Sequence, residues 1–230
     1  MTPAVEPLRA FRRLLKAYGP QHWWPSSGDT LLDSKDLEVC LGAILTQNTN
    51  WLNVEKALKN LHKSNIKNLK DFLRIDQRNL ERLIRSSGYF RQKARKVKEF
   101  VRHLDRRGGR VGKWLSGDLK ARRRELLDIH GIGPETADSI LLYAAQRPAF
   151  VVDAYTLRIG SRLGWWRTAT YDRAQAFLVK KLPKRVPVYN EFHALLVTLA
   201  KRRCRKDPLC AGCPLQDVCR FGSLNHEKKN

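Results

Sequence analysis

The sequence predicts an all-α protein, and three observations support that fold class. Apolar residues recur at helical spacing along nearly all of the 230 residues, and capping residues or glycines separate the periodic segments. No two segments alternate in the manner of paired strands, and no internal repeat is found. A hydrophobic fraction of 42% is enough for one core or for two lobes that share a boundary.

The first half of the chain contains five predicted helices. Leu8, Phe11, Leu15 and Tyr18 mark a helix that ends at Gly19. After the loop QHWWPSSG, either Ser34 or Asp36 can cap the apolar segment LEVCLGAILTQ. The remaining three are WLNVEKALKNLH, a helix that Asp76 begins and residues 86–88 end, and a basic amphipathic helix over 92–104 that ends at 107–109.

The second half is organised around the turn HGIGPE. A helix over 122–128 precedes the turn, and a helix over 136–145 follows it. The segment FVVD is short and extended, and Asp153 at its end can cap the next helix. Two more helices lead to a cysteine-rich segment, and the last few residues are expected to be loose.

Charge is the strongest global signal. The chain has 45 Lys and Arg against 22 Asp and Glu, a net charge of +23, which favours a polyanionic partner such as nucleic acid. A ribosome-type basic surface and a membrane surface are the alternatives. Apolar runs are far shorter than the roughly 20 residues of a membrane span, and the N-terminus has no signal-peptide core. The chain is therefore expected to be cytoplasmic.

The turn HGIGPE has the composition of an anion site. Gly131 and Gly133 permit backbone conformations that other residues avoid, and Pro134 suits the first turn of a helix. Free N–H groups at a helix start can bind a DNA phosphate without base contacts. An ordinary αα-hairpin is the alternative, and the basic charge favours phosphate binding.

LLDIHGIGPETADSILLY followed by VVDAYTLRIGSRLG resembles the helix-hairpin-helix and Gly/Pro-Asp signature of the endonuclease III superfamily of DNA glycosylases. The stretches HWWP, LGAILTQNTNW and SSGYFRQKA resemble the 3-methyladenine DNA glycosylase III branch. The resemblance implies two helical lobes with a DNA-binding cleft between them. It places a six-helix barrel at 34–146, a second lobe at 1–33 and 147–222, and a loose tail at 223–230.

The resemblance also implies base flipping, in which the target nucleotide leaves the duplex and a side chain fills the gap. Gln47 and Tyr89 match gap-filling positions, although a polar helix end and a core aromatic are their structural alternatives. His130, Gly131, Gly133 and Thr136 are expected to contact DNA through the hairpin.

Asp153 matches the catalytic aspartate, whose carboxylate stabilises positive charge on the sugar. A plain helix cap is the alternative, and both roles can coexist. In bifunctional members a lysine after the hairpin forms a Schiff base that permits strand cleavage. The matching residue here is Glu135, so we expect a monofunctional enzyme unless another lysine substitutes.

Three tryptophans match positions around the alkylbase pocket of the resembled branch. Electron-rich rings bind a flat cation such as 3-methyladenine, so Trp23, Trp24 and Trp51 are predicted to line this pocket, with Glu135 nearby. Packing within a lobe is the alternative. Trp51 stands where the branch has phenylalanine.

Cys204, Cys210, Cys213 and Cys219 are spaced closely enough to hold one metal centre, either zinc or an iron–sulfur cluster. The resemblance decides for a [4Fe–4S] cluster, because the loop is similar to that of endonuclease III with one residue fewer in the first gap. The 3-methyladenine branch can lack this loop. Cys40, in an apolar helix, is expected to be a core thiol.

The sequence thus predicts a monomeric base-excision DNA glycosylase that acts on damaged double-stranded DNA, with alkylated purines as the expected substrates. Three alternatives remain: a uracil or mismatched-thymine glycosylase, a bifunctional glycosylase and lyase, and a DNA-lesion binder without catalysis. Asp153 argues against the last of these, and Glu135 argues against the second.

Overall fold

The computed structural model describes residues 4–24 and 30–222. Pro25 of the HWWP stretch and the predicted tail lie outside the described residues. The described part of the chain is helical and contains no strand, so the predicted all-α class is confirmed. No helix within it is long and apolar enough to cross a membrane.

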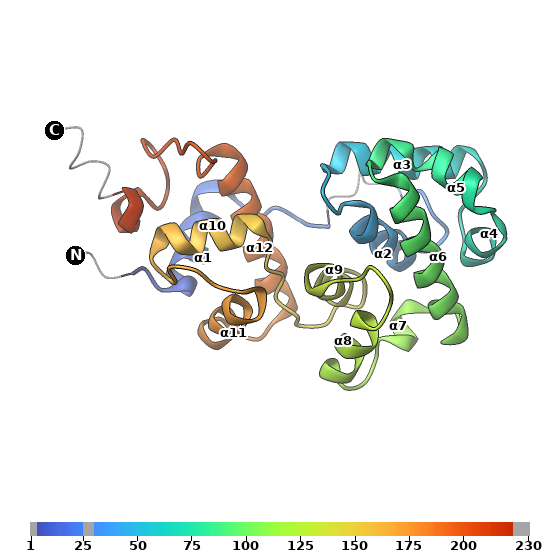
Figure 1. The fold of residues 1–230 in the computed structure, drawn as a ribbon. Coiled ribbons are helices and arrows are strands. Elements are labelled where there is room, and N and C mark those ends of the chain that lie inside the picture. The colour runs from blue at the N-terminus through green and yellow to red at the C-terminus, as the bar shows by residue number, and fades with distance from the viewer. Residues whose placement is uncertain (1–3, 25–29, 223–230) are drawn as a thin grey trace. The chain divides into compact units, whose positions relative to one another are not determined.

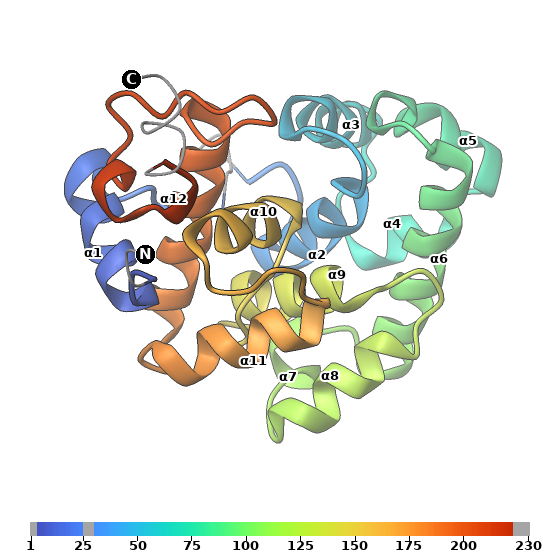
Figure 2. The same ribbon diagram turned by 60° about the vertical axis from the view of Figure 1, so that its left-hand side comes forward.

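The chain divides into two compact units, Trp24–Arg147 and Met1–Trp23 with Pro148–Asn230. The first is called the central unit after its place in the sequence, and the second is called the terminal unit. Figures 1 and 2 show their helices from two directions.

The central unit begins with α2 (Lys35–Leu45) and ends with a helix that changes from α-helical to π-helical geometry. Its other elements, in chain order, are α3 (Trp51–Lys63), α4 (Leu69–Arg74), α5 (Gln77–Leu83), the short helix η1 (Arg85–Ser87), α6 (Phe90–Arg106), α7 (Val111–Trp114), α8 (Leu119–Leu127), α9 (Pro134–Ser139) and the π-helical turn η2 (Ile140–Ala144).

The core of the central unit forms around α2. This helix is buried from Leu37 to Leu45, and α6, α9 and η2 pack against it (Figure 1). Burial on all sides explains why its sequence is apolar throughout rather than amphipathic. Cys40 is fully buried there, and burial raises the pKa of its thiol well above the usual value.

The helix after the hairpin is not continuous. The sequence predicted one helix over 136–145, but α9 begins at Pro134 and gives way to a π-turn at Ile140. The Ala145 N–H donates to the carbonyl of Ile140, five residues earlier, at 3.0 Å. The wider turn is accommodated because all of Ile140–Ala144 is buried, so packing compensates for the less regular backbone.

The terminal unit is built around its longest helix, α12 (Val186–Arg202). The helices α1 (Pro7–Tyr18) and α10 (Ala154–Leu163) pack against α12, and α11 (Tyr171–Lys181) contacts α1 (Figures 1 and 2). A short helix, η3 (Gln216–Val218), follows in the cysteine-rich loop.

The core of the terminal unit is aromatic. The Phe192 ring meets the rings of Phe11, Phe150 and Trp165 with centroids 5.5–6.4 Å apart, and the Trp165 indole donates to the Val5 carbonyl at 2.6 Å. Trp166 lies so close to Gly160 that an added Cβ would come within 2.1 Å of its ring. The Trp165–Trp166 pair therefore packs inside this unit.

Three of the predicted capping residues lie at helix starts. The side chains of Ser34, Asp76 and Asp153 each accept a backbone hydrogen bond at the start of a helix, and Gly19 ends α1 at φ 69°. The short helices α4 and α7 were not predicted. The helix before the turn begins at Leu119, three residues earlier than predicted, because Asp118 caps it.

Candidate nucleic-acid interface and active site

The hairpin joins α8 to α9 through a turn that requires glycine at Gly131 but not at Gly133, whose φ of −90° is open to other residues. Gly131 has φ +83°, and a Cβ there would lie 2.4 Å from Cγ of Lys96. Gly133 is the exposed N-cap of α9. The Arg123 guanidinium donates to both carboxylate oxygens of the fully buried Asp138, at 2.8 and 3.0 Å, and this pair ties the two helices together.

Gln47 is bound to the hairpin. Its Nε2 donates to the Gly131 carbonyl at 3.1 Å and to the Thr136 hydroxyl at 2.9 Å. Its Oε1 accepts from Nζ of Lys96 at 2.5 Å. This one side chain therefore ties the loop after α2 to the hairpin by two hydrogen bonds and to Lys96 of α6 by a third.

The residues predicted to contact DNA through the hairpin differ in exposure. His130 and Gly133 are exposed, and Gly131 is half-buried. Thr136 is buried, and its hydroxyl accepts the hydrogen bond from Gln47. The exposed surface of the turn is thus mainly backbone and His130, whereas Thr136 contacts the interior.

Tyr89 lies at the N-cap of α6 and is 65% exposed. It is therefore not a core aromatic. Its backbone is left-handed, with φ 43°, a conformation unusual for an aromatic residue. The buried Lys93 supports this turn, because its Nζ donates to the carbonyls of Ser87, at 2.5 Å, and Leu45, at 2.8 Å.

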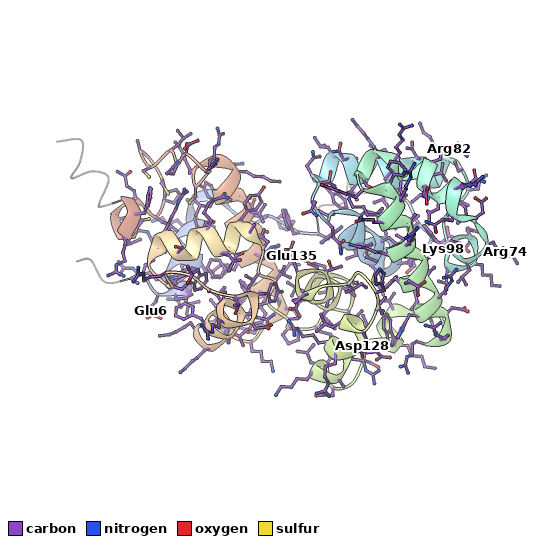
Figure 3. All side chains as sticks on the ribbon, viewed as in Figure 1. Glu6, Arg74, Arg82, Lys98, Asp128 and Glu135 are labelled. Carbon is purple, nitrogen blue, oxygen red and sulfur yellow. The ribbon has the colours of Figure 1, made fainter. Side chains whose placement is uncertain are left out.

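Lys93 therefore joins the end of α2 to the turn before α6. Burial, and after it the nearby charge of Lys96, lowers the pKa of Lys93 from 10.5 to about 8. A second buried lysine, Lys98, lies further along α6 and donates to the carbonyls of Phe72 and Leu73 at the end of α4 (Figure 3). Nothing in the sequence distinguishes these two lysines from the surface lysines of the same basic helix.

Asp153 is the N-cap of α10. Its Oδ1 accepts hydrogen bonds from the backbone N–H of Thr156 at 2.7 Å and from the Thr156 hydroxyl at 2.8 Å. The other oxygen, Oδ2, lies 3.6 Å from Nε2 of His193. Burial alone would raise the pKa of the carboxyl, but His193 and the bonds from Thr156 outweigh it, and the Asp153 pKa is lowered.

His193 is a site residue that sequence reasoning missed. It is buried on α12, forty residues from Asp153 in the sequence. The available signal was a single histidine within the apolar run FHALLV. The ring of Trp23 meets the His193 ring edge-on, with centroids 5.8 Å apart, and Asn190 donates to the Trp23 carbonyl at 2.8 Å.

The two adjacent tryptophans fall into different units. Trp23 lies beside His193 in the terminal unit, and Trp24 lies in the central unit with Trp51 and Tyr143. The Trp24 ring is perpendicular to the Trp51 ring at 5.4 Å and tilted on the Tyr143 ring at 5.0 Å. Gly42 lies beneath the tryptophans, since a Cβ there would come within 3.3 Å of both rings. The indole N–H of Trp24 is buried with no hydrogen-bond partner among the described residues.

Glu135 is exposed in the first turn of α9 (Figure 3). Its carbonyl accepts a hydrogen bond from the Ser139 hydroxyl at 2.7 Å. An acid in this position is favoured by the helix dipole.

All four loop cysteines line one small cavity. Arg162 donates to Sγ of Cys204 at 3.2 Å, and Arg158 donates to the Cys204 carbonyl at 3.0 Å. Burial, and after it the charges of the other loop cysteines, raises the pKa of Cys213 and Cys219. Within residues 4–24 and 30–222, no three His, Cys, Asp or Glu side chains gather closely around a single point.

Residues 41–184 match the model of the HhH-GPD superfamily of base excision DNA repair proteins. The chain belongs to this superfamily. The matched segment includes the second half of α2, the hairpin and the Asp153 cap, so the HhH-GPD residues span parts of both units. The family predicted from the sequence is confirmed, and the chain is a DNA glycosylase of base excision repair.

Relatives of this HhH-GPD protein cover most of its length. It is 42% identical to a candidate DNA repair glycosylase of Methanocaldococcus jannaschii, over 92% of this chain and 94% of the relative. It is 32% identical to endonuclease III of Thermotoga maritima, over 82% and 84%. The structure of the H. pylori 3-methyladenine DNA glycosylase bound to 1,N6-ethenoadenine aligns with a TM-score of 0.72 and 28% identity, covering 86% of this chain and 98% of the other.

Proposed function

We propose that this HhH-GPD protein is a monofunctional DNA glycosylase that removes alkylated purines such as 3-methyladenine from double-stranded DNA. The observation that carries the proposal is the aromatic cluster of Trp24, Trp51 and Tyr143. Aromatic faces attract a flat cationic base more strongly than a neutral one. Such a pocket can therefore select an alkylated base without hydrogen bonds, which a normal base could also make. The H. pylori relative, which is named for 3-methyladenine, supports the same substrate class.

Asp153 is the proposed catalytic carboxylate. Loss of a cationic base leaves positive charge on the sugar, and an ionised carboxylate stabilises that charge most effectively in a preorganised site. The lowered pKa of Asp153 keeps the group ionised at neutral pH. Thr156 fixes one oxygen, and the other, Oδ2, which lies beside His193, is proposed to act on the sugar or on an attacking water.

The residues around the hairpin support the absence of a lyase step. Glu135 cannot form a Schiff base. Lys93 has the lowered pKa of a nucleophilic amine, but it is 1% exposed and bound to two carbonyls. Lys96 packs its stem on Gly131 and donates to Gln47, so it serves the hairpin. His130, Gly131 and Gly133 are proposed to hold a DNA phosphate at the turn.

The four cysteines are proposed to hold a [4Fe–4S] cluster. Four thiols that line one cavity are the donor set that such a cluster uses, and a metal centre would bind them as thiolates. The cluster would fix the shape of a loop that carries Arg203, Arg205 and Lys206, which are candidates for contact with the DNA backbone.

Defined duplexes test the proposal. The protein is incubated with duplexes that each carry one lesion, and the products are analysed with and without alkali. The lesions are a stable 3-methyladenine analogue, uracil, thymine opposite guanine and an oxidised pyrimidine. We expect base loss on the alkylated duplex and strand breaks only after alkali. Breaks without alkali, or trapping of the protein on DNA by borohydride, would contradict the monofunctional assignment. Preferred release of uracil or thymine would contradict the substrate assignment.

A further inference from the structure

Two large apolar side chains stand exposed on neighbouring segments of the central unit. Leu52, in the first turn of α3, is 68% exposed, and Tyr89, before α6, is 65% exposed. The first turn of α3 is joined to η1 because the Ser86 hydroxyl donates to the Asn53 carbonyl at 2.9 Å. The two exposed residues therefore belong to one connected edge, which we call the Leu52–Tyr89 edge.

The Leu52 end of this edge is held by local hydrogen bonds. Asn50 caps α3 by accepting from the Asn53 N–H at 3.1 Å, and the Asn53 side chain donates to the Thr49 hydroxyl at 3.1 Å. The neighbouring Trp51 packs on Trp24. Leu52 is thus presented to solvent on a fixed turn, and the entropy cost of ordering it on contact with a partner is small.

The Tyr89 end is held as firmly. Lys93 bonds the Ser87 carbonyl through Nζ and the Tyr89 carbonyl through its backbone N–H, the latter at 3.0 Å. These bonds fix the left-handed backbone of Tyr89.

The surroundings of the edge are mainly basic. Exposed cations lie on all three segments: Lys56 on α3, Arg82 and Arg85 near η1, and Arg91 on α6. Two acids near the edge, Glu55 and Glu81, contact Lys59 and Gln77, and the acids of α6, Glu99 and Asp105, lie two or more turns further along that helix. An apolar projection within a basic surface matches a partner that is anionic outside and apolar inside, which describes a duplex with a gap in its base stack.

Gln47 was the sequence-based candidate for filling that gap, together with Tyr89. Gln47 would have to break three hydrogen bonds to the hairpin and Lys96 to enter a duplex. Leu52 breaks none, because its side chain is already in solvent. We propose that Leu52 acts with Tyr89 as an apolar wedge that enters the base stack where a nucleotide has been flipped out. This proposal rests on the proposed glycosylase function.

The test measures preference for a gap and needs no lesion chemistry. Affinities are measured for a duplex with a tetrahydrofuran abasic analogue and for the matched intact duplex, and their ratio is compared among variants. The variants are Leu52→Ala, Leu52→Met, Tyr89→Ala and the double alanine variant. Lys59→Ala, two turns further along α3, is the matched control for changes to that helix.

We expect Leu52→Ala to lower the ratio by about threefold to tenfold, as expected for losing part of a buried leucine side chain. Leu52→Met and Lys59→Ala should retain the ratio, and affinity for the intact duplex should stay unchanged in Leu52→Ala. If Leu52→Ala keeps the wild-type preference for the abasic duplex, the wedge proposal is wrong and the proposed base flipping is unaffected. A wild-type protein with no preference for the gap would overturn the wedge and the proposed base flipping together.

Discussion

Replacing Lys93 by methionine should make the protein's stability respond differently to pH. Lys93 is 1% exposed, and its pKa is about 8 instead of 10.5. This difference corresponds to about 3 kcal/mol by which folding disfavours the charged amine. Two hydrogen bonds to the carbonyls of Leu45 and Ser87 oppose this cost, and leaving such acceptors unpaired costs about 1–3 kcal/mol each.

These magnitudes predict that Lys93→Met is close to neutral at pH 7, because the lost hydrogen bonds and the relieved charge burial nearly cancel. Between pH 8 and 10.5 the unfolded chain keeps its proton on Lys93 while the folded chain releases it. The unfolded state then binds more protons, so the stability that Lys93 contributes rises with pH. The free energy of unfolding of the wild type, relative to Lys93→Met, should rise by about 3 kcal/mol over this range.

Urea unfolding at several pH values measures this difference. The raised pKa values of Tyr18, Tyr189 and Cys40 lower the stability of both proteins at alkaline pH, so their effect cancels in the comparison. Lys59→Met is the control, since it removes a surface lysine and leaves the buried Lys93 in place. Lysine side-chain NMR should find one pKa near 8 that disappears in Lys93→Met. A difference that stays flat with pH, or a Lys93 pKa near 10.5, would refute the reasoning.

Three further changes test the proposed site. Asp153→Asn keeps an oxygen that can accept from Thr156, so thermal unfolding should change little. Single-turnover base excision should fall about 100-fold or more, and retained excision would exclude a catalytic role. Gly131→Ala meets Lys96 at a positive φ, so it should lower stability by about 1–3 kcal/mol and weaken binding of undamaged duplex, and unchanged binding would separate the turn from DNA. Cys213→Ser should reduce the iron bound per chain, whereas Cys40→Ala should not; equal iron content would exclude the cysteine loop as the cluster site.

Features set by local sequence were predictable. Side-chain caps and helix-ending glycines act within three or four residues, and Ser34, Asp76 and Gly19 mark the helix ends where the sequence placed them. The short helices α4 and α7 were missed because four to six residues give too little periodicity to recognise. The π-turn after α9 was missed because it depends on burial and not on a local signal.

Features set by tertiary contact were not predictable. The His193–Asp153 approach joins residues forty positions apart, and the buried Lys93 resembles every other lysine of its basic helix until the fold is known. Trp23 and Trp24 are adjacent in the sequence, but only the fold shows that Trp23 contacts the His193 ring whereas Trp24 contacts the Trp51 ring. A sequence motif shows which residues are neighbours along the chain. What each residue can bind depends on the side chains that surround it in the fold.

The two interpretations of Asp153 can be reconciled at the level of its two oxygens. Oδ1 accepts both hydrogen bonds from Thr156 and so caps α10, while Oδ2 lies on the side of His193 and makes no cap contact. The cap therefore fixes the orientation of the carboxylate, and the start of α10 favours its negative charge through the helix dipole. An oriented and ionised carboxylate is what a developing sugar cation requires, so capping provides the preorganisation that the proposed chemistry needs.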